Sequence, residues 1–459
     1  MSLGAGAFEA MVGHLQDLIR IPTVNPPGGE TAAATYLAGV LAEAGLEPEV
    51  VEGHPGRGNV VARLHGDGSS GGPLLLLSHL DVVPVEVERW SQDPFGGAIV
   101  DGYVYGRGAV DMKGTLAMQL AVVLGLAADA RASGHDPARD PIPGLRRDVI
   151  LAATADEESG GLEGIGWIVD ERPELLRAEA CLTETGGMSL ELAGARFYPL
   201  GVAEKGFHRL RFTVHGHGGH GSVPRDDNAA VLAARIVERL AQPLPRSVTP
   251  LMARALERIA AERPALAGPI ATILGPDEAA SRAAIERLCR PPEARALRAL
   301  LRDSISPTIV RSGFKDNVIP ATAEIVIDVR QVPGHDRQAV LDAVQAQLGP
   351  ELWVCCAVEE LIHAQPLEQP QDHPLLAVLA DALRRADPEA IPLPIMAPFA
   401  TDAKHTVRLG IPTFGFSPLR LDPDEPFLER FHGDDERVSL DALRFGLPIL
   451  DQVVRTYCG

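Results

Sequence analysis

Seven histidine and acidic residues stand where apolar runs or glycine-rich turns of this chain end. They are His79, Asp81, Asp111, Glu157, Glu158, Glu184 and His432. Imidazole and carboxylate groups are ligands of zinc in proteins, with bonds of roughly 2.0–2.2 Å. Two histidines with several carboxylates exceed the needs of one tetrahedral ion, whereas a carboxylate bridging two ions about 3.5–4 Å apart would use them all. A two-metal site is one interpretation; for each residue alone, a solvated strand end is the other.

Buried strands are the elements that would bring these residues together. The runs "PLLLLSHLDVV" and "DVILAATADEE" predict strands that end in His79 and in the pair Glu157–Glu158. His79 and Asp81 are two residues apart, so their side chains point to the same face of the strand. In α/β sheets ligands bind beyond the carboxyl ends of the strands, which is where these residues fall.

The order of the predicted elements indicates two domains. Helical patterns near residues 8–21, 30–45 and 112–130 alternate with strand patterns near 58–66, 73–83 and 148–158, which predicts an α/β sheet with helices on both faces. The strands predicted near 207–216 and 322–330, with a helix near 228–241, indicate a small α+β domain. We expect an α/β domain of residues 1–186 and 334–459, interrupted by an inserted domain of residues 187–333 that contains a helical stretch at 247–304.

Composition narrows the possible partners and compartments. The formal net charge of −20 argues against nucleic acid or an anionic membrane surface as a partner. Five scattered cysteines without a CxxC spacing favour a reducing compartment. The first residues lack a basic segment followed by an apolar one, and no apolar run approaches the ~20 residues of a membrane span. We therefore expect a cytoplasmic protein with no membrane partner.

The stretch "GHGGHG" at residues 216–221 formally matches a dinucleotide-binding fingerprint. That fingerprint requires a helix to open directly on the glycines. Here "SVPRDD" intervenes, and we expect the next helix to start near Asn228. The match is therefore rejected as a nucleotide site.

Several motifs together resemble the M20 family of metallopeptidases. They are "SHLDVVP", "YGRGAVDMKG", "ADEESGG", "TETGG", "HGGHGSVP" and "FHGDDE", in this order between about residues 14 and 455. The stretch "SPTIVRSGFKDNVIPATAEIVIDVRQVPGHD" looks most like the carboxypeptidase S branch. The resemblance implies a mixed-sheet zinc-peptidase catalytic domain interrupted by an inserted α+β lid and dimerisation domain.

The resemblance also implies a ligand set for two Zn²⁺ ions, with Co²⁺ or Mn²⁺ as possible substitutes. His79 and Glu184 would bind one ion, Glu158 and His432 would bind the second, and Asp111 would bridge both. Asp81 would orient His79 by accepting its other ring proton.

Further roles follow from the resemblance. Glu157 would be the general base that takes a proton from a zinc-bound water and passes it to the departing nitrogen. His220 would stabilise the tetrahedral oxyanion, reaching the active site from a partner subunit in dimeric members. Asn317 and Arg330 would contact the substrate's carboxylate, and Thr401 would line the cleft.

The implied function is hydrolysis of the amide bond of dipeptides, short peptides or N-acyl amino acids next to a free carboxylate. Carboxypeptidase, dipeptidase and deacylase activities share these motifs, and a homodimer through the inserted domain is possible. Two alternatives stay open, a non-catalytic M20-like binding protein and a two-metal hydrolase of another ester or amide class.

Overall fold

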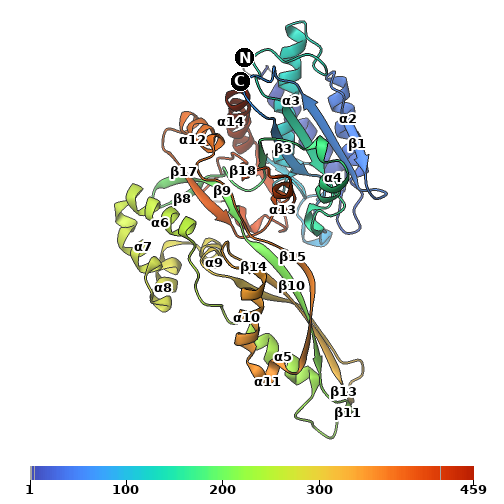
Figure 1. Ribbon diagram of the computed structural model, residues 1–459, viewed down its shortest axis with the longest axis vertical. Helices are drawn as coiled ribbons and strands as arrows, with labels where there is room; N and C mark the ends of the chain where they lie inside the picture. The colour runs from blue at the N-terminus through green and yellow to red at the C-terminus, as the bar shows by residue number, and fades with distance from the viewer. Residues whose placement is uncertain (1–2, 5, 424) are drawn as a thin grey trace. The chain divides into compact units, whose positions relative to one another are not determined.

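The computed structural model describes residues 3–4, 6–423 and 425–459, and the chain divides into two compact units. Unit 1 comprises residues 1–202, 369–394 and 401–459, and unit 2 comprises residues 203–368 and 395–400 (Figure 1). These bounds differ from the expected insertion at 187–333. Strand β9 (Ala195–Glu204) still pairs in the sheet of unit 1, whereas α10 (Arg337–Leu348) and β15 (Cys356–Ala364) pack in unit 2.

Unit 1 is built on a mixed sheet with strand order β1-β2-β6-β3-β7-β18-β9, which confirms the predicted α/β class. The central strands β6, β3, β7 and β18 are parallel, and β1, β2 and β9 are antiparallel to their neighbours. The bounds are β1 Glu49–Glu52, β2 Gly58–Leu64, β3 Leu74–His79, β6 Val149–Thr154, β7 Ala180–Thr183 and β18 Thr413–Gly415. Strands β8 (Leu190–Leu192), β16 (Leu367–Glu368) and β17 (Ala390–Ala397) pair with β9.

Helices cover both faces of the unit 1 sheet, as predicted. On one face the Ser78 hydroxyl donates to Gln119 of α3 (Lys113–Ala132) over 2.9 Å, and on the other Leu75 and Leu77 pack with α4 (Ile165–Glu171) (Figure 1). Alternation of side chains along β3 explains the split. The remaining helices of unit 1 are α1 Ala7–Arg20, α2 Thr31–Glu43, α12 Pro374–Ala386, α13 Ala403–Thr406 and α14 Leu440–Cys458.

Helix α3 departs from the expectation that no apolar run of this chain approaches the length of a membrane span. By length and composition it is the one helix among the described residues that could cross a membrane, and 67% of its apolar window is buried inside the structure. Burial of this extent is that of a core helix packed on a sheet, which is the position that α3 occupies on β3.

A small three-stranded sheet of unit 1 joins two distant parts of the chain. Strand β5 (Tyr103–Tyr105) pairs on one side with β4 (Ile99–Val100) and on the other with β19 (Arg437–Ser439). This pairing brings the segment that precedes Asp111 beside the segment that follows His432.

Unit 2 contains a four-stranded antiparallel sheet of order β12-β14-β10-β15, covered on one face by α5 (Ala229–Leu240) and α10. The other strands are β10 Gly206–His215, β12 Ser304–Ser312 and β14 Thr322–Gln331, and a separate two-stranded ribbon joins β11 Gly219–His220 to β13 Val318–Ile319. Asn228 caps α5, as expected, since its side chain accepts the Ala230 N–H. The short helix α11 spans Pro350–Trp353.

The helical stretch expected near 247–304 forms an excursion from unit 2. Its helices are α6 Pro250–Glu262, α7 Ala267–Leu274, α8 Glu278–Leu288 and α9 Pro291–Leu300. His335 links the two ends of this stretch: Ser247 Oγ lies 3.0 Å from His335 Nε2, and His335 Nδ1 lies 2.6 Å from the Asp303 carboxylate. The Ser247 N–H also donates to Leu301 across the two ends of the excursion.

Candidate metal centre

The parallel pairing of β6, β3 and β7 brings three strand ends to one edge of the unit 1 sheet. His79 is in register with Thr154 of β6, and Leu76 is in register with Leu182 of β7. His79 therefore lies at the same edge as the acids that follow β6 and β7. This is the edge at which α/β sheets bind ligands.

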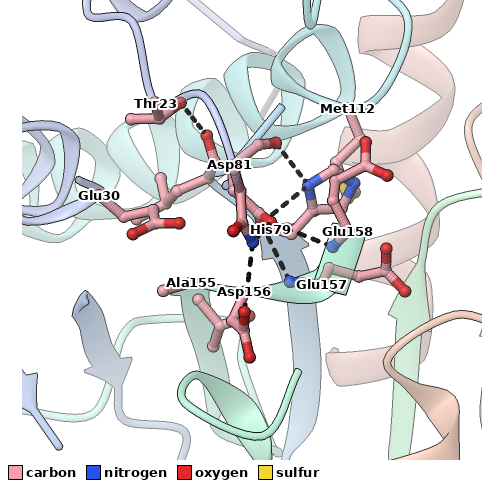
Figure 2. A network of polar contacts seen from close by, with 12 residues as sticks. Thr23, Glu30, His79, Asp81, Met112, Ala155, Asp156, Glu157 and Glu158 are labelled. Atoms are coloured by element: carbon pink, nitrogen blue, oxygen red, sulfur yellow. Dashed lines mark hydrogen bonds and ion pairs between the residues drawn. The ribbon is translucent and has the colours of Figure 1, made fainter. Parts of the chain in front are cut away.

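Asp81 contacts both His79 and the residues that follow β6. His79 Nδ1 lies 2.9 Å from the Asp81 backbone carbonyl and 3.5 Å from its carboxylate. The two carboxylate oxygens accept the backbone N–H groups of Glu157 and Glu158 over 3.1 and 3.0 Å, and Asn25 donates to one of them over 2.8 Å (Figure 2). The Asp81 side chain therefore positions the acids after β6. The Nδ1 proton of His79 was expected to reach the Asp81 carboxylate, but the backbone carbonyl of Asp81 is its nearer acceptor.

Glu157 and Glu158 lie on a short 3₁₀ turn (Glu157–Ser159) rather than on the strand itself, which ends at Thr154. Successive residues of a 3₁₀ turn point in directions about a third of a revolution apart. This geometry, rather than strand alternation, gives the two neighbouring carboxylates different directions.

Asp111 lies between two histidines. Its Oδ1 atom lies 3.1 Å from His79 Nε2, and its Oδ2 atom lies 3.2 Å from His432 Nε2. Glu184 adds a carboxylate oxygen 3.7 Å from His79 Nε2, and Glu158 adds one 3.2 Å from His432 Nε2. The structure thus gathers five residues into two groups that share Asp111.

The donor atoms are close enough to surround cations. Those of His79, Asp111 and Glu158 lie within 4.8 Å of one another, and so do those of His79, Glu157 and Glu184. Glu158 Oε1 is buried and has no hydrogen-bond partner among the described residues. A buried carboxylate oxygen without a donor is costly, and a cation would satisfy it.

The pKa values of these groups show how strongly the cluster attracts positive charge. Burial raises the pKa of Glu158 to about 7, although its hydrogen bond with His432 acts in the opposite direction. Hydrogen bonds to Asp111 and Glu158 raise the pKa of His432 to about 10. Burial, followed by the charge of Asp111, raises the pKa of Glu184 well above its usual value. Protons take up the excess negative charge here, and metal ions would replace them, so the residues present fit a two-metal site.

Glu157 has a cationic neighbour that sequence analysis did not single out. Lys404 Nζ donates to Glu157 Oε1 over 3.1 Å and to the Thr401 carbonyl over 3.1 Å, and lies 3.6 Å from Asp402. The predicted residue Thr401 is fully buried, and its hydroxyl accepts the Ala403 N–H. Thr401 thus reaches the cluster through its backbone and Lys404.

Three predicted residues lie in unit 2 and are described there. His220 is exposed on β11, and Ser222 Oγ lies 2.7 Å from its Nδ1 atom. Exposed Asn317 accepts the Gly221 N–H through its carbonyl, so it lies beside His220 on the ribbon. The Arg330 guanidinium donates to Asp328 over 2.9 and 3.1 Å and lies over the Phe207 ring.

Other residues around the cluster, above all Asn25, Lys404 and Glu436, were missed. One signal in the sequence marks the lysine. The chain contains four lysines among 42 basic residues, and three of them, Lys113, Lys205 and Lys404, are buried or nearly so. Asn25 and Glu436 act through contacts with residues far along the chain, which local patterns do not reveal.

This chain is similar to several known proteins over most of its length. Aminoacylase-1 of Sus scrofa is 29% identical over 99% of this chain and 96% of its own length. The N-fatty-acyl-amino acid synthase/hydrolase PM20D1 of Homo sapiens is 27% identical over 97% of this chain and 87% of its own length. Among solved structures, the M20 family metallo-carboxypeptidase Sso-CP2 of Sulfolobus solfataricus superimposes with a TM-score of 0.72 at 16% identity, covering 97% of this chain and 99% of that one.

The match to a family profile covers most of the chain. Residues 75–456 match the family described as Peptidase family M20/M25/M40. The matched range includes the cluster that the structure assembles at the edge of the unit 1 sheet. The chain belongs to this peptidase family, whose members related to it are hydrolytic enzymes.

Proposed function

We propose that this hydrolase uses two metal ions, zinc by preference, to cleave an amide bond next to a free carboxylate. The observation that carries the proposal is the position of Asp111, whose two oxygens face two different histidines. Mixed imidazole and carboxylate donors suit zinc, and Co²⁺ or Mn²⁺ are the alternatives. In this proposal His79 and Glu184 complete the first ligand group, and Glu158 and His432 complete the second.

Glu157 is proposed as the general base. Metal ions in such a site lower the pKa of water to about 7 and polarise the scissile carbonyl. Glu157 accepts the proton of the attacking water and delivers it to the departing nitrogen, so the amide bond breaks and a carboxylic acid and an amine are released. Lys404 donates to one oxygen of the Glu157 carboxylate and so fixes its direction beside the cluster.

N-acyl amino acids are the proposed substrate class, with short peptides second. Two relatives that align over at least 97% of this chain are named for acyl-amino acid chemistry, aminoacylase-1 and PM20D1. Asn317 and Arg330 are proposed to bind the free carboxylate, and His220 to stabilise the oxyanion. The planar guanidinium of Arg330 would bind the substrate's carboxylate while it also donates to Asp328.

We also propose a homodimer through unit 2, in which His220 acts in the partner's site. Strand β12 is an edge strand of the unit 2 sheet and offers unpaired backbone groups. Light scattering after size exclusion tests this. Two inactive variants, His220→Ala and Glu157→Gln, should restore activity when mixed as dimers, and a lack of complementation with both variants dimeric would contradict it.

The test of function is release of free amine from a panel of N-acyl amino acids and dipeptides. Zinc-loaded protein should hydrolyse a subset, and protein treated with EDTA should hydrolyse none until zinc is restored. Bound zinc with no release from any substrate would favour a binding protein. Release of phosphate or alcohol from ester substrates, without amide cleavage, would favour a two-metal hydrolase of another class.

A further inference from the structure

A buried ion pair of unit 1 lies outside the donor cluster and joins the two segments that carry Asp111 and His432. Glu436 is fully buried, and Arg107 is 3% exposed. Arg107 Nη1 donates to Glu436 Oε2 over 2.8 Å. The guanidinium carbon also lies 5.2 Å from the centre of the Trp90 ring, which shields the pair from water.

The other carboxylate oxygen of Glu436 binds the backbone of the Asp111 turn. Glu436 Oε1 accepts the N–H of Val110 over 2.8 Å and the N–H of Asp111 over 3.1 Å. A carboxylate that accepts two backbone N–H groups fixes the direction of the residue that follows them. The Asp111 side chain therefore leaves the backbone from an anchored peptide.

The cationic side of the pair holds the His432 backbone. Arg107 Nη2 donates to the His432 carbonyl over 3.3 Å, and the Gly106 N–H donates to the Glu436 carbonyl over 2.9 Å. His432 lies in a loop with a positive φ of 57°, a conformation that a non-glycine residue keeps only when its surroundings hold it. The guanidinium is one such contact.

Asp111 and His432 need this support more than the other donors do. His79 ends a buried strand of the sheet, and Glu184 follows another, so the sheet positions them. Asp111 precedes α3 in a turn, and His432 lies in a loop before β19. A buried ion pair costs desolvation and is weak evidence of stability, whereas its hydrogen bonds to the Asp111 turn and to the His432 carbonyl favour a positioning role.

We propose that Glu436 and Arg107 act as one positioning unit that sets the separation of Asp111 and His432 and thereby the affinity for the second metal ion. The inference rests on the proposed two-metal function. It assigns Glu436 and Arg107 no contact with substrate or metal. Loss of the unit weakens the ion held by Glu158 and His432 more than the ion held by His79 and Glu184.

Glu436→Gln is the first test. The amide oxygen can still accept the N–H groups of the turn, but its NH₂ group faces the Arg107 donors, so the link to His432 is lost. We expect the affinity for the ion held by Glu158 and His432 to fall about 10- to 100-fold, while the affinity for the ion held by His79 and Glu184 changes little. Titration of metal-free protein with Co²⁺, followed by calorimetry and by the visible absorption of bound cobalt, measures both ions without any assay of activity.

A matched control separates positioning from general stability. Asp387 is also buried in unit 1 and accepts hydrogen bonds from Arg196 and Tyr198. Asp387→Asn should lower the melting temperature of the metal-free protein by an amount similar to Glu436→Gln, yet bind both ions as the wild type does. Arg107→Lys is the second variant if Glu436→Gln does not fold, because one ammonium cannot replace both guanidinium contacts.

The outcomes are separable from those of the proposed function. If the wild type binds two ions and hydrolyses amides, and the Glu436 and Arg107 variants bind both ions with unchanged affinities, the positioning role is wrong and the function stands. If both ions weaken equally in these variants and in Asp387→Asn, the pair has only a structural role. If the wild type binds no pair of ions, the proposed function itself fails.

Discussion

His79 Nδ1 lies 2.9 Å from the backbone carbonyl of Asp81 and 3.5 Å from the Asp81 carboxylate. The carboxylate is instead the acceptor of the N–H groups of Glu157 and Glu158. One residue therefore supports two strand ends by different means, through its main chain for β3 and through its side chain for the turn after β6.

This division of roles predicts an asymmetric effect of Asp81→Asn. The variant keeps the backbone acceptor of His79, but one carboxylate oxygen becomes an NH₂ group that faces a backbone donor. The turn that carries Glu158 should shift, and the affinity for the ion held by Glu158 should fall about 10- to 100-fold. Cobalt titration measures both ions, and a loss confined to the ion held by His79 and Glu184 would contradict the division.

Glu157→Gln should separate metal binding from turnover. Glutamine has nearly the same shape but cannot accept the proton of the attacking water, so kcat should fall about 10²- to 10⁴-fold. The metal content should stay that of the wild type, because the proposed ligands are other residues. The control is Glu171→Gln, an exposed change at the end of α4 that should leave both quantities unaltered. Full turnover in Glu157→Gln would remove Glu157 from the mechanism.

Metal removal should destabilise unit 1. Without cations the acids of the cluster are compensated only by protons and by the two histidines, and binding of ions to the folded state alone stabilises it by about 2.7 kcal/mol per ion at a hundredfold excess over Kd. Thermal melting with EDTA and with excess zinc should show a clear rise with zinc. The rise should shrink in His79→Ala, and an equal rise in that variant would place the zinc elsewhere.

Stability above neutral pH should depend on Lys205 of unit 2. Burial lowers the pKa of this lysine to about 8, and its Nζ atom donates to Ser304 Oγ over 3.2 Å. An unfolded lysine titrates near pH 10.4, so between about pH 8 and 10.4 the unfolded chain binds a proton that the folded chain has released. More protons bound in the unfolded state mean that stability rises with pH in this window, by about 3 kcal/mol in total.

The Lys205→Met variant isolates this effect. It removes the ammonium and its hydrogen bond at every pH, so only the lysine of the wild type titrates in the window. The melting temperature of the wild type minus that of the variant should therefore increase between about pH 7 and pH 10. A difference that stays constant would show that Lys205 keeps its proton in the folded state.

Much of the fold was predictable because burial leaves a local pattern. The apolar runs that end at His79 and at Thr154, and the amphipathic helices α1, α5 and α12, follow periodicities that a single segment carries. The boundary between the units was not predictable in this way. Helix α10 and strand β15 have ordinary patterns, and only their partners place them in unit 2.

By itself the sequence determined which residue types stand at the strand ends, and hence the chemistry of the site. His79, Glu158 and Glu184 lie together because parallel strands end at one edge of a sheet. Only the tertiary structure decided the position of Asp111 between two histidines, the turn that separates Glu157 from Glu158, and the Arg107–Glu436 link. They depend on contacts between segments that lie from about 30 to more than 300 residues apart in the sequence, and such contacts form only when the whole unit packs.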